Sequence, residues 1–306
     1  MKKKPPYKRV PREKIQKKVN FIRKLMSFAA KDMVAMEGRI GKSTWFQTEK
    51  GPVQCLCYGF ENPEVTPVLF DIHGGGFVMA SAGMDDPYMP QFVEKCGVKV
   101  IGIDYTLAPD EMFPYAIEQC RAVMLYVKEH AKDLKVDPDR MMIMGHSAGG
   151  NFCAAIGLME NSDPKLNLKG IILDYPPTDI ATDPYDKPMP EGCLDPGMSR
   201  MFNDAYCKPE EAKNPLVSPT FATVDMVDKF PPTLVITASH DSLADETEHL
   251  KDTLISAGVD VTFKRFEGCH HGFTVIDKRQ AKKNPKDWEA APIAWDMMVE
   301  HVKKYI

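Results

Sequence analysis

The chain has 306 residues, of which 43% are hydrophobic and 27% are charged, and its formal net charge is -4. This composition is ordinary for a globular protein and supplies enough apolar side chains for a sizeable core. The charge balance gives no reason to expect nucleic acid as a partner, and no apolar run approaches the length of a membrane-spanning helix.

The beginning of the chain is rich in lysine and arginine. Four apolar residues recur there with the spacing of one helical face, namely Ile15, Val19, Ile22 and Met26. The apolar run 19–22 is cut by two basic residues and no small-residue cleavage site follows, which does not fit a signal peptide. We predict a basic, amphipathic helix rather than a membrane or nucleic-acid contact.

Eight cysteines are present, without any Cys-x-x-Cys pair and without Cys or His pairs at the spacing of zinc ligands. Cys55 and Cys57 are two residues apart on a predicted strand and point to the same face. We therefore expect buried free thiols in a cytoplasmic protein, and no metal.

Predicted strands and helices alternate along most of the chain. Strands are expected at 43–48, 53–58, 67–72, 98–105, 141–144, 170–175, 233–238 and 259–266, with a turn at 137–139. Helices are expected at 114–130, 150–159 and 244–256, and a last helix contains Trp288, Trp295 and Val299. The alternation predicts a single α/β domain over residues 1–306, whose mostly parallel sheet is covered by helices on both faces.

This alternation breaks up between Pro176 and about Lys229, where prolines are frequent and the helical pieces are short. The stretch is too long for an ordinary connection, and regular alternation resumes after it. We predict a lid rather than a linker.

The pentapeptide Gly145-His146-Ser147-Ala148-Gly149 has the form G-x-S-x-G. It lies between a predicted strand and a run of small apolar residues suited to a buried helix, which is the context of a nucleophile elbow. Glycines on both sides let the chain fold closely around a strained serine. The motif is weak by itself, because Gly, Ser and Ala are common in turns, so its partners must support it.

A serine hydroxyl becomes a good nucleophile when a histidine takes its proton. The loop 267–273 is bounded by glycines and follows a predicted strand, where sites in such sheets collect. We expect one of its two histidines, His270 or His271, to be the base. His249 and His301 fall within predicted helices, and we expect both on the surface.

A carboxylate should orient that histidine. Asp241 is the first choice because it follows a predicted strand end, whereas Asp245 and Glu246 would lie on the next helix. The alternative role for Asp241 is a helix cap.

The run His73-Gly74-Gly75-Gly76 follows another predicted strand and offers backbone N–H groups that a substrate can approach closely. Such a run also occurs in flexible turns and phosphate loops. A phosphate loop would continue with Lys and Ser or Thr, but Phe77 and Val78 follow here.

Taken together, these motifs closely resemble the hormone-sensitive lipase family of α/β-hydrolases. The resemblance spans about two hundred residues in the family's order and rests on 73–77, 104–109, 145–150, 241–246 and 271–273, with 113–114 and 215–219 also similar. It implies an α/β-hydrolase fold, a mostly parallel central sheet with helices on both faces, and a helical lid formed by about 1–42 and 177–229.

The resemblance also implies a role for each site residue. Ser147 would be the nucleophile, His271 the base and Asp241 the orienting acid. The implied oxyanion hole consists of the N–H groups of Gly75, Gly76 and Ala148, with His73 and Gly74 as supporting residues that shape the glycine loop.

Three positions depart from the family pattern. His146 stands where an acidic residue is usual before the serine, Thr106 replaces an arginine, and Asp110 replaces a glutamate. These changes leave the three implied catalytic residues intact but leave the subgroup and its substrate open. We expect His146 to point away from the serine at the turn.

The predicted function is that of a serine carboxylesterase that cleaves short-acyl esters of small molecules without a cofactor. The alternatives are a deacetylase of acetylated carbohydrates, an amidase-like hydrolase, and a small-molecule receptor that has lost its chemistry. We expect Met198, Met201, Phe202 and Tyr206 to line the substrate pocket or to form the packed face of a lid helix. A homodimer would pair through the edge strand 259–266.

Overall fold

The computed structural model describes residues 10–29, 35–36, 38–276 and 283–306. In these ranges eight strands form one sheet in the order β1-β2-β4-β3-β5-β6-β7-β8. The strands are β1 (Lys42–Thr48), β2 (Gly51–Tyr58), β3 (Thr66–Ile72), β4 (Lys99–Ile103), β5 (Val136–His146), β6 (Leu168–Asp174), β7 (Thr233–His240) and β8 (Val261–His270). β2 pairs antiparallel with β1 and β4, and every other pairing is parallel, which confirms the mostly parallel sheet.

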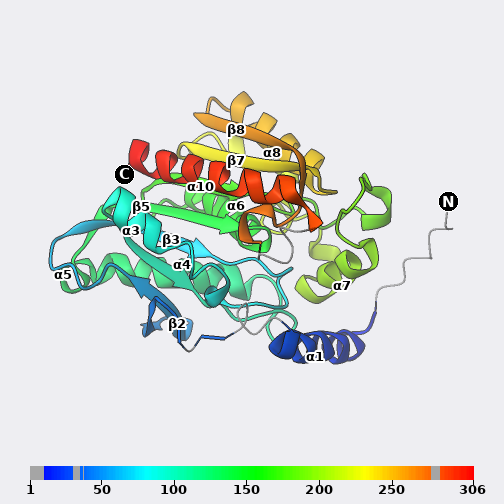
Figure 1. Cartoon of the computed structure of the whole chain (residues 1–306), viewed down its shortest axis with the longest axis horizontal. Helices are drawn as coiled ribbons and strands as arrows, with labels where there is room; N and C mark the ends of the chain where they lie inside the picture. Colours follow the sequence, from blue (N-terminus) through cyan, green and yellow to red (C-terminus); the bar gives the residue numbers. More distant parts are fainter. Residues whose placement is uncertain (1–9, 30–34, 37, 277–282) are drawn as a thin grey trace.

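Helices cover the sheet on both faces (Figure 1). Their bounds are α1 (Arg12–Ala29), α3 (Pro90–Cys96), α4 (Tyr115–Glu129), α5 (Ala131–Leu134), α6 (Ala148–Ser162), α7 (Pro196–Tyr206), α8 (Ala244–Ser256) and α10 (Pro285–Tyr305). Phe70 and Ile72 of β3 pack with the apolar faces of α4, α6 and α8, whereas Leu69 packs with those of α3 and α10. Because successive strand residues point to opposite faces, a strand between two helical layers is apolar on both sides, and all seven residues of β3 are buried.

The long stretch after β6 contains α7 and several single-turn 3-10 helices before the alternation resumes at β7. Prolines begin four of these pieces, at 184, 196, 209 and 219, where a residue without an N–H fits a first helical turn. The irregular stretch therefore has the short helical segments that its sequence predicts.

The basic segment forms the helix α1, and it packs on the protein. Ile15 and Val19 are buried, Ile22 is half-buried, and the side chain of Met26 lies outside the described part of the chain. Arg23 donates hydrogen bonds to the carbonyl oxygens of Val78 and Ala108. Figure 1 shows α1 beside α7, which it contacts.

Two local predictions are wrong. His301 is buried, not exposed, because it lies on the sheet-facing side of α10, and burial lowers its pKa to about 4. The predicted turn at 137–139 lies within the first part of β5, where the pairing with β3 shifts between Val136 and Met141. One turn-like contact is present there, a hydrogen bond from the backbone N–H of Asp139 to the side chain of Asp137.

All eight cysteines are free thiols, and six of them are buried. The two on β2 are both buried, as their spacing predicts. Among the helices that the structure describes, none has the length and apolarity needed to cross a membrane.

The contact between α6 and β3 leaves no room for a side chain at Gly149. A Cβ atom there would lie 1.8 Å from the carbonyl oxygen of Ile72, which is backbone and cannot turn away. We expect Gly149→Ala to lower the free energy of unfolding by about 1–3 kcal/mol, because the helix must move off the strand. Chemical denaturation monitored by circular dichroism measures this change.

Gly102→Ala is the matched control for that experiment. Like Gly149, Gly102 is buried, but it lies on the strand β4. A Cβ atom at Gly102 would have its nearest neighbour, the Cβ of Ala82, at 3.5 Å, which is an ordinary contact. If the two variants lose equal stability, the close approach of α6 to β3 is not the constraint that we describe.

Candidate active site

Ser147 lies in a sharp turn between the last residue of β5 and the first residue of α6. Its backbone has φ 52° and ψ -116°, a conformation that residues other than glycine rarely adopt. The backbone N–H of Ser147 donates to the carbonyl of Asp174 at 2.8 Å, which ties the turn to the end of β6. A Cβ on Gly145 would lie 2.4 Å from the backbone of Gly149, so the flanking glycines are sterically required.

Three side chains from three strand ends form one hydrogen-bonded chain. The Nδ1 atom of His271 lies 2.7 Å from Oδ2 of Asp241, and its Nε2 atom lies 2.8 Å from Oγ of Ser147. An ionised carboxylate can only accept, so Nδ1 carries the proton and Nε2 is free to accept from the serine hydroxyl. The structure therefore brings together the three residues that the sequence singles out.

Asp241 bonds both to the backbone just before a helix and to the histidine, in line with the two roles that the sequence allows for it. Its Oδ1 atom accepts from the backbone N–H of Leu243 just before α8, and its Oδ2 atom bonds to the histidine. Asp245 is exposed and lies near Arg265, while Glu246 is buried and accepts from the backbone N–H groups of Thr178 and Asp179. Both lie on α8, as predicted, and their partners are away from the histidine.

Charge controls the protonation of His271, whose side chain is partly buried. Burial disfavours the imidazolium form, but the nearby Asp241 carboxylate and its hydrogen bond favour it more strongly, so the pKa of His271 is raised above its usual value of 6.5. The acceptor form of the ring is consequently lost when the pH falls below this raised pKa.

The neighbouring His270 has different partners. Its Nδ1 atom lies 3.1 Å from a carboxylate oxygen of Asp287 at the start of α10, and its Nε2 atom lies 3.4 Å from Nδ1 of His240. His249 is exposed on α8, in agreement with its prediction. Of the two histidines left open by the sequence, His271 is the one that contacts the serine.

The glycine run directly follows β3 and faces the same turn. Gly75 and Gly76 have φ values of 112° and 59°, which favour glycine. The His73 ring stacks on Tyr105, its Nδ1 donates to the carbonyl of Gly74, and the Tyr105 hydroxyl donates to the carbonyl of His73. Burial lowers the pKa of His73 to about 4, so this ring is neutral and holds the loop through hydrogen bonds and stacking.

A cavity of about 240 Å³ opens above Ser147. Its lining includes Gly75, Gly76, Ser147, His271, Met198 and Phe202. Met201 packs against the core instead, and Tyr206 is buried and stacks on Phe77. Two of the four predicted lining residues of α7 therefore face the cavity and two form its packed face, because residues on one helix divide between opposite sides.

A group of charged side chains lies behind the turn, on the face of the sheet that α10 covers. His146 donates from Nδ1 to Oδ2 of Asp174 at 2.7 Å, and its ring lies 5.2 Å from that of Trp295. Asp71 and Asp85 lie next to it, and ligand atoms of Asp71, Asp85 and His146 are all within 4.8 Å of one another. Of the residues that the structure describes, these three form the arrangement that could hold a metal ion.

Sequence reasoning did not identify Asp71, Asp85 and Asp174. A signal was available for two of them, because Asp71 is the second-last residue of β3 and Asp174 the last residue of β6, and each is a polar residue at the end of an apolar strand. It could not be used without the strand order, which places β3, β5 and β6 side by side.

A family model described as the alpha/beta hydrolase fold matches residues 69–275. An arylesterase of Saccharolobus solfataricus is 28% identical over 209 residues, covering 67% of this chain and 68% of that protein. An acetyl esterase of Salmonella schwarzengrund is 28% identical over 234 residues, covering 74% of this chain and 71% of that protein.

The solved structure of a hyperthermophilic esterase from the archaeon Pyrobaculum calidifontis superposes with a TM-score of 0.81 at 27% identity. That similarity covers 98% of this chain and 99% of the other. The family match spans well over half of the chain and includes the serine turn, the glycine run, Asp241 and His271. The chain therefore belongs to the hormone-sensitive lipase and carboxylesterase family of α/β-hydrolases, and it is an esterase-type hydrolase.

Proposed function

We propose that this protein is a serine carboxylesterase that hydrolyses small, short-acyl esters through an acyl-enzyme intermediate. The observation that carries the proposal is the continuous hydrogen-bonded chain from Ser147 Oγ through His271 to Asp241. A hydroxyl, an imidazole with its acceptor nitrogen toward that hydroxyl, and a carboxylate that fixes the ring are the parts needed to activate a serine.

In the proposed reaction, His271 takes the proton of Ser147 as Oγ bonds to the ester carbonyl carbon. The bond between the carbonyl carbon and the alkoxy oxygen then breaks, and the protonated His271 gives its proton to that leaving oxygen, which departs as the alcohol. Water next loses a proton to His271 and attacks the carbonyl carbon of the acyl-enzyme; the bond to Oγ breaks, His271 returns the proton to Ser147, and the acid is released. Asp241 stabilises the imidazolium that forms twice in this cycle.

The negative charge on the carbonyl oxygen needs donors in the same place at both steps. We assign this role to the backbone N–H groups of Gly75, Gly76 and Ala148. Support comes from the left-handed backbone of the two glycines, from their position in the cavity wall and from Ala148 being the first residue of α6. The free N–H groups at a helix start favour negative charge.

The preference for short acyl chains rests on the cavity. Its volume of about 240 Å³ is small, and Met198 and Phe202 narrow it from the side of α7. The acetyl and aryl esterases among the relatives agree with a small substrate. Deacetylation of a carbohydrate or cleavage of an amide would use the same three residues, whereas a receptor without chemistry would have no need of the complete set.

The proposal extends to the surroundings of the site. We assign the lid to residues 177–229 together with about 1–42, of which 1–9, 30–34 and 37 lie outside the described residues. The cavity-lining residues of α7 and the packing of α1 on α7 support this assignment. The free cysteines support a cytoplasmic location, where thiols stay reduced. β8 lies at one edge of the sheet and would pair two chains in a homodimer.

Hydrolysis of p-nitrophenyl esters from acetyl to long acyl chains tests the function. We expect turnover to be greatest for acetyl to butyryl esters, and Ser147→Ala to lower kcat by about 10⁴-fold or more. Release of p-nitrophenol is measured, with circular dichroism as the control for folding. A folded wild-type protein that cleaves no ester in the series would redirect the assignment to acetylated carbohydrates or amides, and then to a receptor.

Comparison of the two adjacent histidines tests the base. We expect His271→Ala to lower kcat about 10⁴-fold, because among the described residues it is the His271 ring that bonds to the serine oxygen. His270→Ala should keep activity within about tenfold, because its partners are His240 and Asp287. Loss of turnover in His270→Ala with retention in His271→Ala would refute the assignment.

The pH profile tests the acid. We expect kcat/KM of the wild-type enzyme to fall with decreasing pH already above the ordinary histidine pKa of 6.5, because the pKa of His271 is raised. Asp241→Asn removes the charge that raises it, so the acidic limb should move to lower pH while kcat falls by about 10⁴-fold.

Asp245→Asn is the control, since this exposed carboxylate lies near Arg265 instead. In Asp241→Asn the side-chain oxygen can still accept from Leu243, so folding should be retained. A greater loss of activity in Asp245→Asn, with both variants folded, would place the acid elsewhere.

A further inference from the structure

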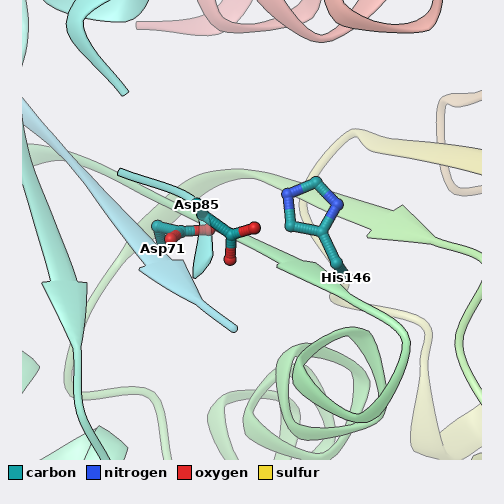
Figure 2. A group of neighbouring side chains, drawn as sticks. All are labelled: Asp71, Asp85 and His146. Carbon is teal, nitrogen blue, oxygen red and sulfur yellow. The ribbon is translucent and has the colours of Figure 1, made fainter. Parts of the chain in front are cut away.

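Three ionisable side chains meet in the interior directly behind the serine turn. Asp71 belongs to β3, Asp85 to the loop before α3, and His146 is the last residue of β5. All three are buried, with exposed fractions of 0%, 0% and 1%. Figure 2 shows the carboxylate of Asp85 directed toward the imidazole of His146, with Asp71 beside it.

The polar atoms of this cluster lack partners outside the cluster. Within the part of the chain that the structure describes, no other group hydrogen-bonds to the carboxylate oxygens of Asp71 and Asp85 or to the Nε2 atom of His146, and the two carboxyl groups have each other and the imidazole as polar neighbours. Buried polar groups are nearly always fully hydrogen-bonded, and a buried charge without a partner is strongly unfavourable. Five polar atoms with so few partners around one small volume indicate that something binds between them.

The neighbouring residue shows the contrast. Asp86 is also buried, but its carboxylate accepts from the backbone N–H groups of Ile40 and Gly41 and from the Tyr58 hydroxyl. The loop thus satisfies the carboxylate of Asp86 but gives the carboxylate of Asp85, the residue before it, no hydrogen bond. The lack of partners is therefore specific to the side chains around His146.

The orientation of His146 fits a metal ligand. Its Nδ1 atom donates to Asp174, and that carboxylate is itself fixed by a hydrogen bond from Thr274. This leaves Nε2 directed away from Asp174, where it would bind an ion in exchange for its proton. Ligand histidines in metal sites almost always have their second nitrogen held by a carboxylate or carbonyl in this way.

We propose that Asp71, Asp85 and Nε2 of His146 bind one divalent metal ion, with Zn²⁺ as the ion that best suits two carboxylates and an imidazole. The ligand atoms all lie within 4.8 Å of one another around one volume. Zn²⁺ takes nitrogen and carboxylate oxygen at about 2.0–2.2 Å, so bound ligands lie up to about 4 Å apart, and the three side chains would move slightly inward around the ion. Two negative charges match one divalent ion.

The site would be structural. It joins β3, the loop before α3 and β5 at the residue that precedes Ser147, and no step of the proposed hydrolysis needs the ion. The sequence-based expectation of no metal rested on local ligand spacing, whereas these ligands are 14 and 61 residues apart along the chain (71 to 85, and 85 to 146). Such a set becomes visible only when the strand order is known.

Metal analysis of the whole chain tests the proposal. Because the cluster is buried, the protein is unfolded in guanidinium with a chelator and refolded with or without Zn²⁺. Inductively coupled plasma mass spectrometry should then find about one Zn²⁺ per chain after removal of free metal. The loaded form should unfold at a temperature about 5 °C or more above the metal-free form.

Variants connect the binding to these residues. Asp85→Asn and His146→Gln should reduce the Zn²⁺ content at least tenfold, while Asp86→Asn and Ser147→Ala should retain it. Ser147→Ala also separates this proposal from the esterase assignment, since it removes hydrolysis and leaves the ligands intact. If wild-type protein refolds without retaining metal, or if Asp85→Asn and His146→Gln both keep it, the proposal is wrong.

Crystals of the wild-type protein make the test independent of variant folding. Protein refolded with Zn²⁺ should give an anomalous difference peak at the zinc edge between Asp71, Asp85 and His146. A water molecule there, without anomalous signal, would overturn the metal assignment and would show that water satisfies the cluster.

Discussion

The close approach of α6 to the ends of β3 and β5 is the constraint on which the site depends. With no side chain at Gly149, the helix start contacts the backbone of Ile72, and the chain between strand and helix is compressed into the strained turn at Ser147. The next residue after Ile72 begins the glycine run. One contact therefore fixes Ser147 and the glycine run relative to each other through the backbone alone.

The proposed acid and base reach this turn because the sheet is parallel in its larger part. β7 and β8 run in the same direction as β5, so the residues that follow them, Asp241 and His271, appear at the same edge as Ser147. Asp241 is additionally fixed by the backbone of Leu243, and this second bond limits its rotation. The three residues are far apart in sequence, but each is positioned by a rigid strand end.

Sequence patterns predicted the strands and the order of the motifs, because these depend on local periodicity and on the direction of parallel strands. The patterns left His270 and His271 open, and the family resemblance indicated His271. The prediction for His301 is wrong, because its side of α10 faces the sheet. For α7 the sequence allowed both roles, and tertiary contact divides them: Met198 and Phe202 line the cavity, whereas Met201 and Tyr206 face the core. Asp71 and Asp85 were missed because β3 and the loop before α3 are brought next to β5 only by the strand order of the sheet.

The serine turn consequently separates two environments. On one side lies a largely apolar cavity, where a neutral acceptor nitrogen and backbone N–H groups suit a reaction that creates charge transiently. On the other lies a permanent group of buried carboxylates around His146, held by Asp174 and Thr274. A strained backbone persists only when its surroundings fix it from several directions. His146 directly precedes Ser147, and Asp174 both accepts from the His146 ring and receives the backbone N–H of Ser147 on its carbonyl, so this polar group and the strained turn share one support at the end of β6.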